Sequence, residues 1–276
     1  MRAENSSTGT GSSSAPGPAV IPTYHEITEE SSSYSYSVTA EQFAAHVAVI
    51  AKQRPPTRSL PRITFDDGVQ SQYRHALPIL RQHSVAATFF VNTGLIGVIP
   101  EYMDWAQLEE TFRLGHRVQS HGWSHACLPQ CSDVQLDEEL RRSKGTLEDR
   151  LGRVVDEISM PGGRWDRRVL EACARAGYRR VYLSDPWARS AAHTGVEVVG
   201  RLMVRSTMGS GELARALNAR GATVMLGRAR YHLKERIKGL IGHGLYHRLW
   251  LALSGYNKFA ADNHRTPDLD FRHKPK

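Results

Sequence analysis

The sequence lacks the features that mark a membrane protein or a disulfide-stabilised secreted protein. No run approaches the roughly 18 apolar residues that a membrane-spanning helix needs. The three cysteines, Cys127, Cys131 and Cys173, form no C-x-x-C pair, so we interpret them as reduced structural thiols. No apolar stretch follows the first basic residue, so we expect no secretory signal and predict a cytoplasmic protein.

Outside its C-terminal tail, the chain also lacks a marked excess of either charge. The net charge is +8, and residues 228–276 contribute eleven Lys and Arg against four Asp and Glu, a local +7. The remainder is close to neutral, which argues against a nucleic-acid partner. Residues 1–18 are rich in Ser, Gly, Thr and Pro and hold almost nothing to bury, so we predict that they are disordered.

Between residues 19 and 227 the chain contains a repeated alternation of strand and helix patterns. Short apolar runs predict strands at 19–27, 62–65, 86–92, 116–120, 155–160, 179–184 and 195–204. Amphipathic segments predict helices at 37–53, 71–83, 103–115, 133–152, 167–177 and 210–221. This order requires parallel strands joined by right-handed crossovers. We therefore predict an α/β fold, a closed or nearly closed (β/α) barrel of about seven strands, with an open doubly wound sheet as the alternative.

Residues suited to metal binding and acid–base chemistry follow two of the predicted strands. Asp66 and Asp67 in TFDDG follow one, and His121 and His125 in SHGWSH follow another. Each pattern alone has an ordinary interpretation, because Asp-Asp-Gly is good turn chemistry and H-x-x-x-H is common. In either fold, however, the carboxyl ends of the strands form the active site. Two imidazoles and one carboxylate leave coordination positions free, which is typical of a catalytic metal site.

These motifs resemble those of the polysaccharide deacetylases of carbohydrate esterase family 4. The resemblance rests on TFDDG, on SHGWSHACL about 55 residues later, on MPGGRWD, and on their order. Weaker agreement extends over roughly residues 20–210. The resemblance implies a distorted (β/α) barrel and a hydrolase that removes an N-acetyl group, or less often an O-acetyl group, from a sugar.

The resemblance also implies roles for individual residues. Asp67, His121 and His125 would bind a divalent metal, zinc first, with cobalt and nickel as alternatives, and Asp66 would act as the base. The resemblance implies substrate-binding roles for Pro161, Gly162, Gly163 and Trp187, and we add Arg164 and Asp185, which follow the same predicted strands. Among them, Pro161–Gly163 would form a groove wall and Trp187 a lining near the acetyl methyl group.

Two residues of the family pattern are missing. The stretch ATVMLGRARYHL lacks the Leu-x-His motif that usually supplies the general acid, and Ser159 stands where an arginine usually orients the base. We expect His25, which follows the first strand, to serve as the substitute acid, with a satisfied loop histidine as the ordinary interpretation. Arg164 could approach the base in place of the missing arginine.

The departures leave two alternatives to an active deacetylase. One is an impaired deacetylase-fold protein that binds acetylated sugar without turnover, and the other is a metal hydrolase of a different bond, such as a phosphoester. We predict action on a cytoplasmic sugar or lipid-linked intermediate of polysaccharide or glycolipid assembly.

The basic tail at 228–276 is predicted to be a helical extension. Apolar residues at helical spacing in YHLKERIKGLIGHGLYHRLWLA are typical of a helix packed on a core. Their basic flank and Trp250 also suit a helix lying on an anionic membrane surface, which would place the protein peripherally on the inner face of the membrane.

Overall fold

The computed structural model describes residues 20–53, 61–188 and 195–219, together with single positions between 222 and 236. The predicted disordered segment 1–18 lies outside these residues. So does the predicted extension 228–276, apart from a few positions near its start. In the described ranges, no helix has the length and apolar character needed to cross a bilayer.

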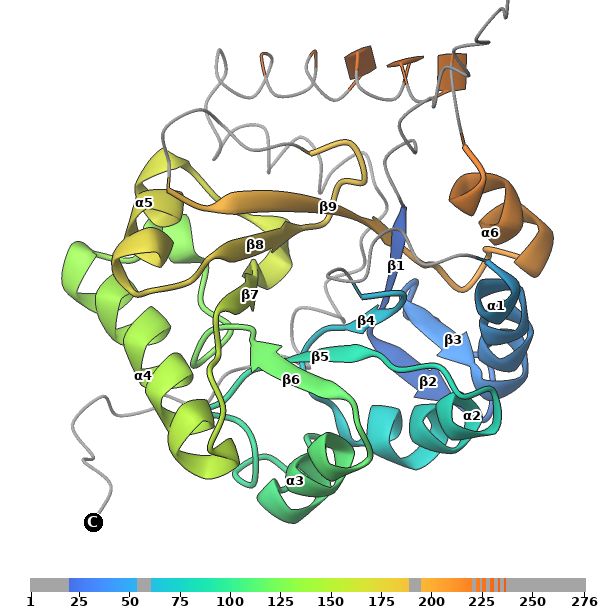
Figure 1. Ribbon diagram of the computed structural model, residues 1–276, viewed down its shortest axis with the longest axis horizontal. Helices are drawn as coiled ribbons and strands as arrows, with labels where there is room; N and C mark the ends of the chain where they lie inside the picture. Colours follow the sequence, from blue (N-terminus) through green and yellow to red (C-terminus); the bar gives the residue numbers. More distant parts are fainter. Residues whose placement is uncertain are drawn as a thin grey trace, which may run out of the picture.

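Seven parallel strands form a closed barrel in the order β1-β4-β5-β6-β7-β8-β9 (Figure 1). They are β1 (Ile21–Tyr24), β4 (Thr64–Phe65), β5 (Thr88–Val91), β6 (Arg117–Ser120), β7 (Glu157–Ser159), β8 (Arg180–Leu183) and β9 (Glu197–Met203). The barrel closes where β1 pairs with β9, with Ile21 beside Arg201. The predicted barrel is confirmed, and the open sheet is wrong.

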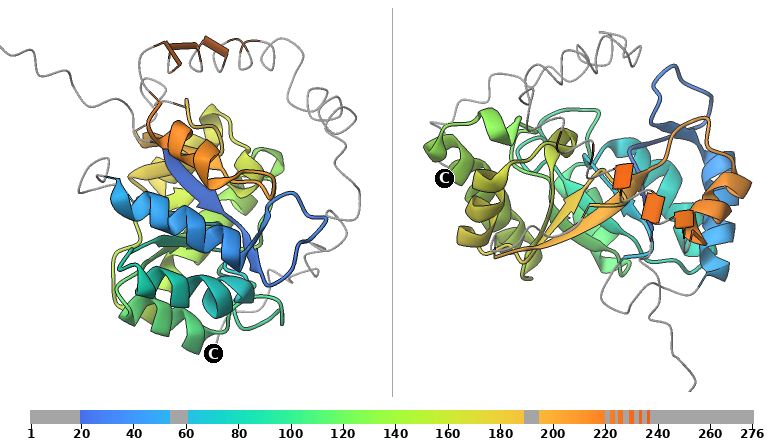
Figure 2. Two further views of the ribbon diagram at one scale, coloured as in Figure 1. Left: turned by 90° about the vertical axis from the view of Figure 1, so that its right-hand side faces the viewer. Right: turned by 90° about the horizontal axis from the view of Figure 1, so that it is seen from above.

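Helices surround the barrel on its outside (Figure 1). They are α1 (Ala40–Lys52), α2 (Leu77–Gln82), α3 (Trp105–Arg113), α4 (Asp133–Leu151), α5 (Arg167–Arg175) and α6 (Ser210–Leu217). Figure 2 shows α6, α1, α2 and α3 following one another along one side. Thr39 caps the N-terminus of α1, because its side chain accepts a hydrogen bond from Gln42 N.

Two local features depart from the predicted elements. The helix expected at 71–83 begins as a π-helical turn, η1 (Gln72–Ala76), before α2. Pro78, near the start of α2, has no N–H to donate to the preceding turn, which favours this change of hydrogen bonding. In addition, β2 (Glu26–Thr28) and β3 (Ser37–Thr39) form a small parallel sheet. Strands of three residues carry too little periodicity to be recognised in the sequence.

Apolar side chains also fill the inside of the barrel. Ile21, Phe90, Tyr182 and Val199 form a cluster separate from the main core. They come from β1, β5, β8 and β9, and β5 pairs with none of the other three, so they meet across the interior. The Phe90 and Tyr182 ring centroids are 4.8 Å apart. The barrel is therefore a packed core whose polar chemistry lies at its ends.

Candidate metal and acid–base site

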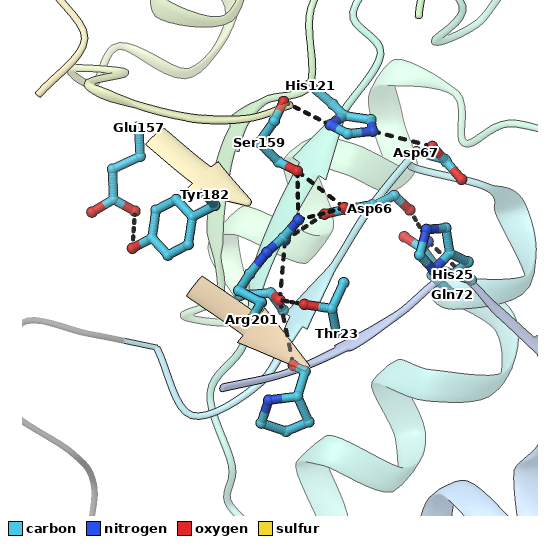
Figure 3. A network of polar contacts seen from close by, with 12 residues as sticks. Thr23, His25, Asp66, Asp67, Gln72, His121, Glu157, Ser159, Tyr182 and Arg201 are labelled. Atoms are coloured by element: carbon cyan, nitrogen blue, oxygen red, sulfur yellow. Dashed lines mark hydrogen bonds and ion pairs between the residues drawn. The ribbon is translucent and has the colours of Figure 1, made fainter. Parts of the chain in front are cut away.

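The predicted site residues all follow barrel strands at their carboxyl ends. Asp66 and Asp67 follow β4, His121 follows β6, and His25 follows β1. Figure 3 shows these side chains together with Ser159 of β7 and Arg201 of β9. Parallel strands present their carboxyl ends at one rim, so residues far apart in sequence meet there.

Asp67, His121 and His125 bring three metal-binding side chains together. One ligand atom from each lies within 4.8 Å of the other two. Asp67 Oδ1 lies 3.4 Å from His121 Nε2 and 3.5 Å from His125 Nε2. The His121 side chain is 2% exposed and that of His125 is 29% exposed, so the cluster is closed on one side and open on the other. This donor set fits a divalent cation with free coordination positions.

The environment of His121 leaves its Nε2 atom available for a metal. Its other ring nitrogen, Nδ1, lies 2.9 Å from the carbonyl oxygen of Ser159, which can only accept a hydrogen bond. Nδ1 therefore carries the proton, and Nε2 faces Asp67. A backbone carbonyl that fixes the imidazole in this way is the usual partner of a metal-binding histidine.

Two of the three candidate ligands have a strained backbone. The φ angles of Asp67 and His125 are 77° and 63°, a left-handed region that non-glycine residues rarely adopt. Gly68, at φ 82°, continues the turn, and a Cβ there would lie 2.8 Å from Val91 Cγ1. The turn is locked by Asn92 N, which donates to the Asp67 carbonyl at 3.1 Å. The Asp-Asp-Gly motif thus forms a turn and also aims a carboxylate, and such strain is concentrated at functional sites.

Asp66 is a buried carboxylate held by an arginine. Arg201 Nη1 and Nη2 donate to its two oxygens at 2.7 Å each, and Ser159 Oγ donates to Oδ2 at 3.0 Å (Figure 3). Burial alone would raise the pKa of Asp66, but the bidentate Arg201 guanidinium outweighs it and holds that pKa below the usual range. Asp66 is therefore ionised at neutral pH.

Arg201 is the residue that the sequence analysis missed. We considered that Arg164 could approach the base in place of the arginine absent at Ser159, but a different arginine pairs with Asp66. The guanidinium that pairs with Asp66 comes from β9, whereas Arg164 donates to Cys127 Sγ at 3.4 Å. One signal was available: an arginine in the middle of the apolar run VVGRLMV must find a buried partner.

His25 lies on the same rim as the two carboxylates. Its ring packs against Tyr36, with centroids 5.3 Å apart, and its Nδ1 has no hydrogen-bond partner within the described part of the chain. Burial lowers the pKa of His25, opposed by the nearby Asp67 and Asp66. Gln72 Nε2 donates to the carbonyls of both His25 (2.7 Å) and Asp66 (2.5 Å), which ties the two strand ends together.

The predicted substrate-binding residues follow β7 and β8 at this same end. Pro161–Gly163 form a short 3-10 turn, η3, in which Gly163 has φ 64°. A Cβ at Gly163 would lie 2.7 Å from Ser184 Oγ, so the two loops are closely packed. Asp185 Oδ1 accepts a hydrogen bond from Trp187 N at 3.0 Å, which shapes the loop after β8. The substrate-binding roles of these residues remain predictions.

Comparisons with known proteins agree with the fold and the motifs. The family model described as polysaccharide deacetylase matches residues 53–181, somewhat less than half of the chain. YxkH of Bacillus subtilis, named for the same family, is 27% identical over 192 residues, covering 63% of this chain and 67% of YxkH. A chitooligosaccharide deacetylase of Bradyrhizobium is 32% identical over 138 residues, covering 48% of this chain and 60% of that protein.

A solved structure supports the architecture. The Streptococcus pyogenes deacetylase PplD, determined in complex with acetate, superposes with a TM-score of 0.65 at 24% identity, covering 73% of this chain and 99% of PplD. At this identity the likeness concerns the fold. The chain spans about half to two thirds of the length of the curated relatives. Residues 53–181 therefore match the polysaccharide deacetylase family model, and the barrel that they help to build has the same fold as the Streptococcus pyogenes deacetylase.

Proposed function

We propose that this protein is a metal-dependent hydrolase that removes an acetyl group, N-acetyl in the first instance, from a sugar or glycan. The single observation that carries the proposal is the arrangement of Asp67, His121 and His125 within 4.8 Å, beside an ionised and arginine-held Asp66. Relatives named as chitooligosaccharide and peptidoglycan-N-acetylglucosamine deacetylases support the substrate class.

Asp67, His121 and His125 would hold the divalent metal, with zinc preferred and cobalt and nickel as alternatives. When bound, such an ion acidifies a water molecule and polarises a carbonyl group. Asp66 would accept the proton of the attacking water through Oδ1, which accepts a hydrogen bond from Arg201 and keeps a second lone pair, whereas Oδ2 accepts from both Arg201 and Ser159. Arg201 keeps Asp66 ionised and fixes its orientation.

His25 would supply the proton that the departing amine needs. It follows β1 on the same rim as Asp66, and the late stretch ATVMLGRARYHL contains no Leu-x-His motif. Burial lowers the pKa of His25 below 6.5, so the protonated fraction of its ring falls as the pH rises through that lowered pKa. We therefore expect the alkaline limb of the kcat/KM profile to disappear in His25→Ala.

The remaining residues of the rim would bind the sugar. Pro161, Gly162 and Gly163 would form one wall, Trp187 the apolar lining near the acetyl methyl, and Arg164 and Asp185 polar contacts. Their common position after β7 and β8 supports this assignment.

The deciding experiment is acetate release from the metal-reconstituted protein. Purified chain loaded with zinc, cobalt or nickel is incubated with N-acetylated oligosaccharides and O-acetylated controls, and acetate is measured enzymatically. Release that depends on metal supports the proposal. Metal and sugar binding without acetate would instead indicate an impaired deacetylase, and release of phosphate from phosphoesters would indicate a different hydrolase.

We further propose that the substrate is a cytoplasmic, lipid-linked intermediate of polysaccharide or glycolipid assembly, reached through membrane contact by residues 228–276. The local charge of +7 supports this part. Sedimentation with phosphatidylcholine vesicles, with and without phosphatidylglycerol, tests it. Truncation after Ala229 should abolish binding to the anionic vesicles, and unchanged binding would exclude the tail.

A further inference from the structure

Helix α4 carries two polar residues within the apolar face that packs on the barrel. Glu139 is 1% exposed and Ser143, one turn later, is fully buried, although their neighbours on this face are leucines. A carboxylate taken out of water is strongly destabilising unless donors surround it. The position of Glu139 therefore needs an explanation that core packing does not provide.

In the described part of the chain, the side-chain hydrogen bonds of Glu139 all go to the loop between His121 and His125. Trp123 N and Ser124 N donate to Glu139 Oε2 at 2.9 and 3.0 Å. The Ser124 hydroxyl donates to Oε1. Three donors from two consecutive loop residues thus converge on one buried carboxylate, which compensates for its loss of water.

Ser143 extends this anchorage to the end of β6. Its hydroxyl lies 2.8 Å from Ser120 Oγ and 2.7 Å from Thr93 Oγ1. Ser120 Oγ in turn accepts a hydrogen bond from Gly122 N at 3.1 Å. The amides of residues 122, 123 and 124 are therefore each held by a side-chain oxygen.

This anchorage acts on a loop with an unfavourable backbone. Gly122 has φ 79° and His125 has φ 63°, so the loop crosses the left-handed region twice within four residues. A segment of this kind keeps its shape only where its surroundings over-determine it. Glu139 supplies that constraint midway between the two candidate histidine ligands.

We propose that Glu139 is a positioning residue for the metal centre: it holds the His121–His125 loop so that both Nε2 atoms face Asp67. The inference rests on the metal site proposed above, but it is independent of the reaction and of the substrate. The negative charge of the Glu139 carboxylate strengthens all three hydrogen bonds. A glutamine in its place would lack that charge: its oxygen would accept from the two amides, and its NH2 group would donate to the Ser124 hydroxyl.

Metal affinity of the full chain, measured without substrate, tests the proposal. Zinc and cobalt dissociation constants are determined by competition with a chromophoric chelator for the natural chain, Glu139→Gln, and the control Glu138→Gln. Glu138 is the preceding residue on α4 and is partly exposed. We expect Glu139→Gln to weaken metal binding by about 10- to 100-fold, as for other groups that orient metal ligands, and Glu138→Gln to change it less than about twofold. The visible spectrum of bound Co²⁺ should also change only in Glu139→Gln.

The outcomes separate this inference from the proposed function. If the natural chain binds no metal, the metal-centre proposal fails and this inference fails with it. If the natural chain binds metal and Glu139→Gln binds it equally well, Glu139 is only a structural residue, even if the melting temperature falls. Should Glu139→Gln not fold, Ser124→Ala removes one donor while leaving the carboxylate, and it must then weaken metal binding more than Glu138→Gln does.

Discussion

At each end of the barrel an arginine pairs with a buried carboxylate, and the two networks differ in which groups they leave without a partner. At the amino end, Glu157 of β7 pairs with Arg117 at 2.9 Å and Arg180 at 2.8 Å and accepts from the Tyr182 hydroxyl at 3.1 Å. At the carboxyl end, Asp66 pairs with Arg201 and Ser159. Glu157 and Asp66 are 1% and 2% exposed.

At the amino end the charges are matched throughout. Both oxygens of Glu157 are engaged, and Arg180 also pairs with Glu197 at 2.6 Å. At the carboxyl end, Asp67 is shared between two histidines on a strained backbone, and His25 Nδ1 has no partner in the described residues. The same ion-pair chemistry therefore stabilises one end and, at the other, holds the Asp66 carboxylate beside groups that remain available for ligands.

The largest expected effect is on catalysis and separates Asp66 from Glu157. Asp66→Asn should lower the rate of acetate release by about 10²- to 10⁴-fold, because the amide cannot accept the proton of water. Glu157→Gln, at the opposite end, should keep kcat within about twofold. Parallel kinetic assays on metal-loaded proteins measure both. Equal losses of kcat in Asp66→Asn and Glu157→Gln would contradict the assignment of catalysis to the carboxyl end of the barrel.

The second prediction concerns stability and compares Arg201→Met with Arg180→Met. Removing Arg201 leaves Asp66 buried without its partner, which should destabilise the metal-free fold by about 3–5 kcal/mol. Removing Arg180 leaves Glu157 paired with Arg117, so about 0.5–3 kcal/mol is expected. Urea unfolding of both variants gives the two free energies, and a larger loss for Arg180→Met would reverse the comparison.

The direction in which stability changes with pH can be predicted for the natural chain and for Arg201→Met. In the natural chain the pKa of Asp66 lies below its usual 3.8, so its contribution to stability is present above that pH and is lost as the pH falls below it. In Arg201→Met the guanidinium no longer offsets the effect of burial, so the pKa of Asp66 rises. Stability should then increase as the pH is lowered from 7 toward 4. A variant that loses stability over this range would show that Arg201 does not control Asp66.

The smallest expected effect concerns Tyr182, which lies between the two networks. It tests whether the two ends of the barrel act independently. Its ring lies 5.7 Å from the Arg201 guanidinium carbon, and its hydroxyl donates to Glu157. Tyr182→Phe keeps the ring and removes the hydroxyl, so we expect a loss of about 1 kcal/mol in the free energy of unfolding. Acetate release should stay within about twofold. A tenfold loss of activity would mean that the two networks are coupled.

Local sequence patterns predicted much of the fold. The Thr39 cap, the Gly152 end of α4 at φ 60°, and the alternation of strand and helix each depend on residues close together in the chain. The positions of Asp66, Asp67, His121 and His125 at one rim followed from the same patterns, since parallel strands end at one edge. The η1 turn and the β2–β3 sheet were missed, because short irregular elements depend on tertiary contacts.

The sequence by itself determined which residues could bind a metal and that they would share one end of a barrel, because these properties lie in short motifs and in strand order. Only the tertiary structure decided which arginine pairs with the buried Asp66 carboxylate. Arg201 is 135 residues from Asp66, and the two meet because β9 closes the barrel against β1, next to β4. Pairing across a closed barrel depends on register and on the desolvation of both charges, and neither is written in a local pattern.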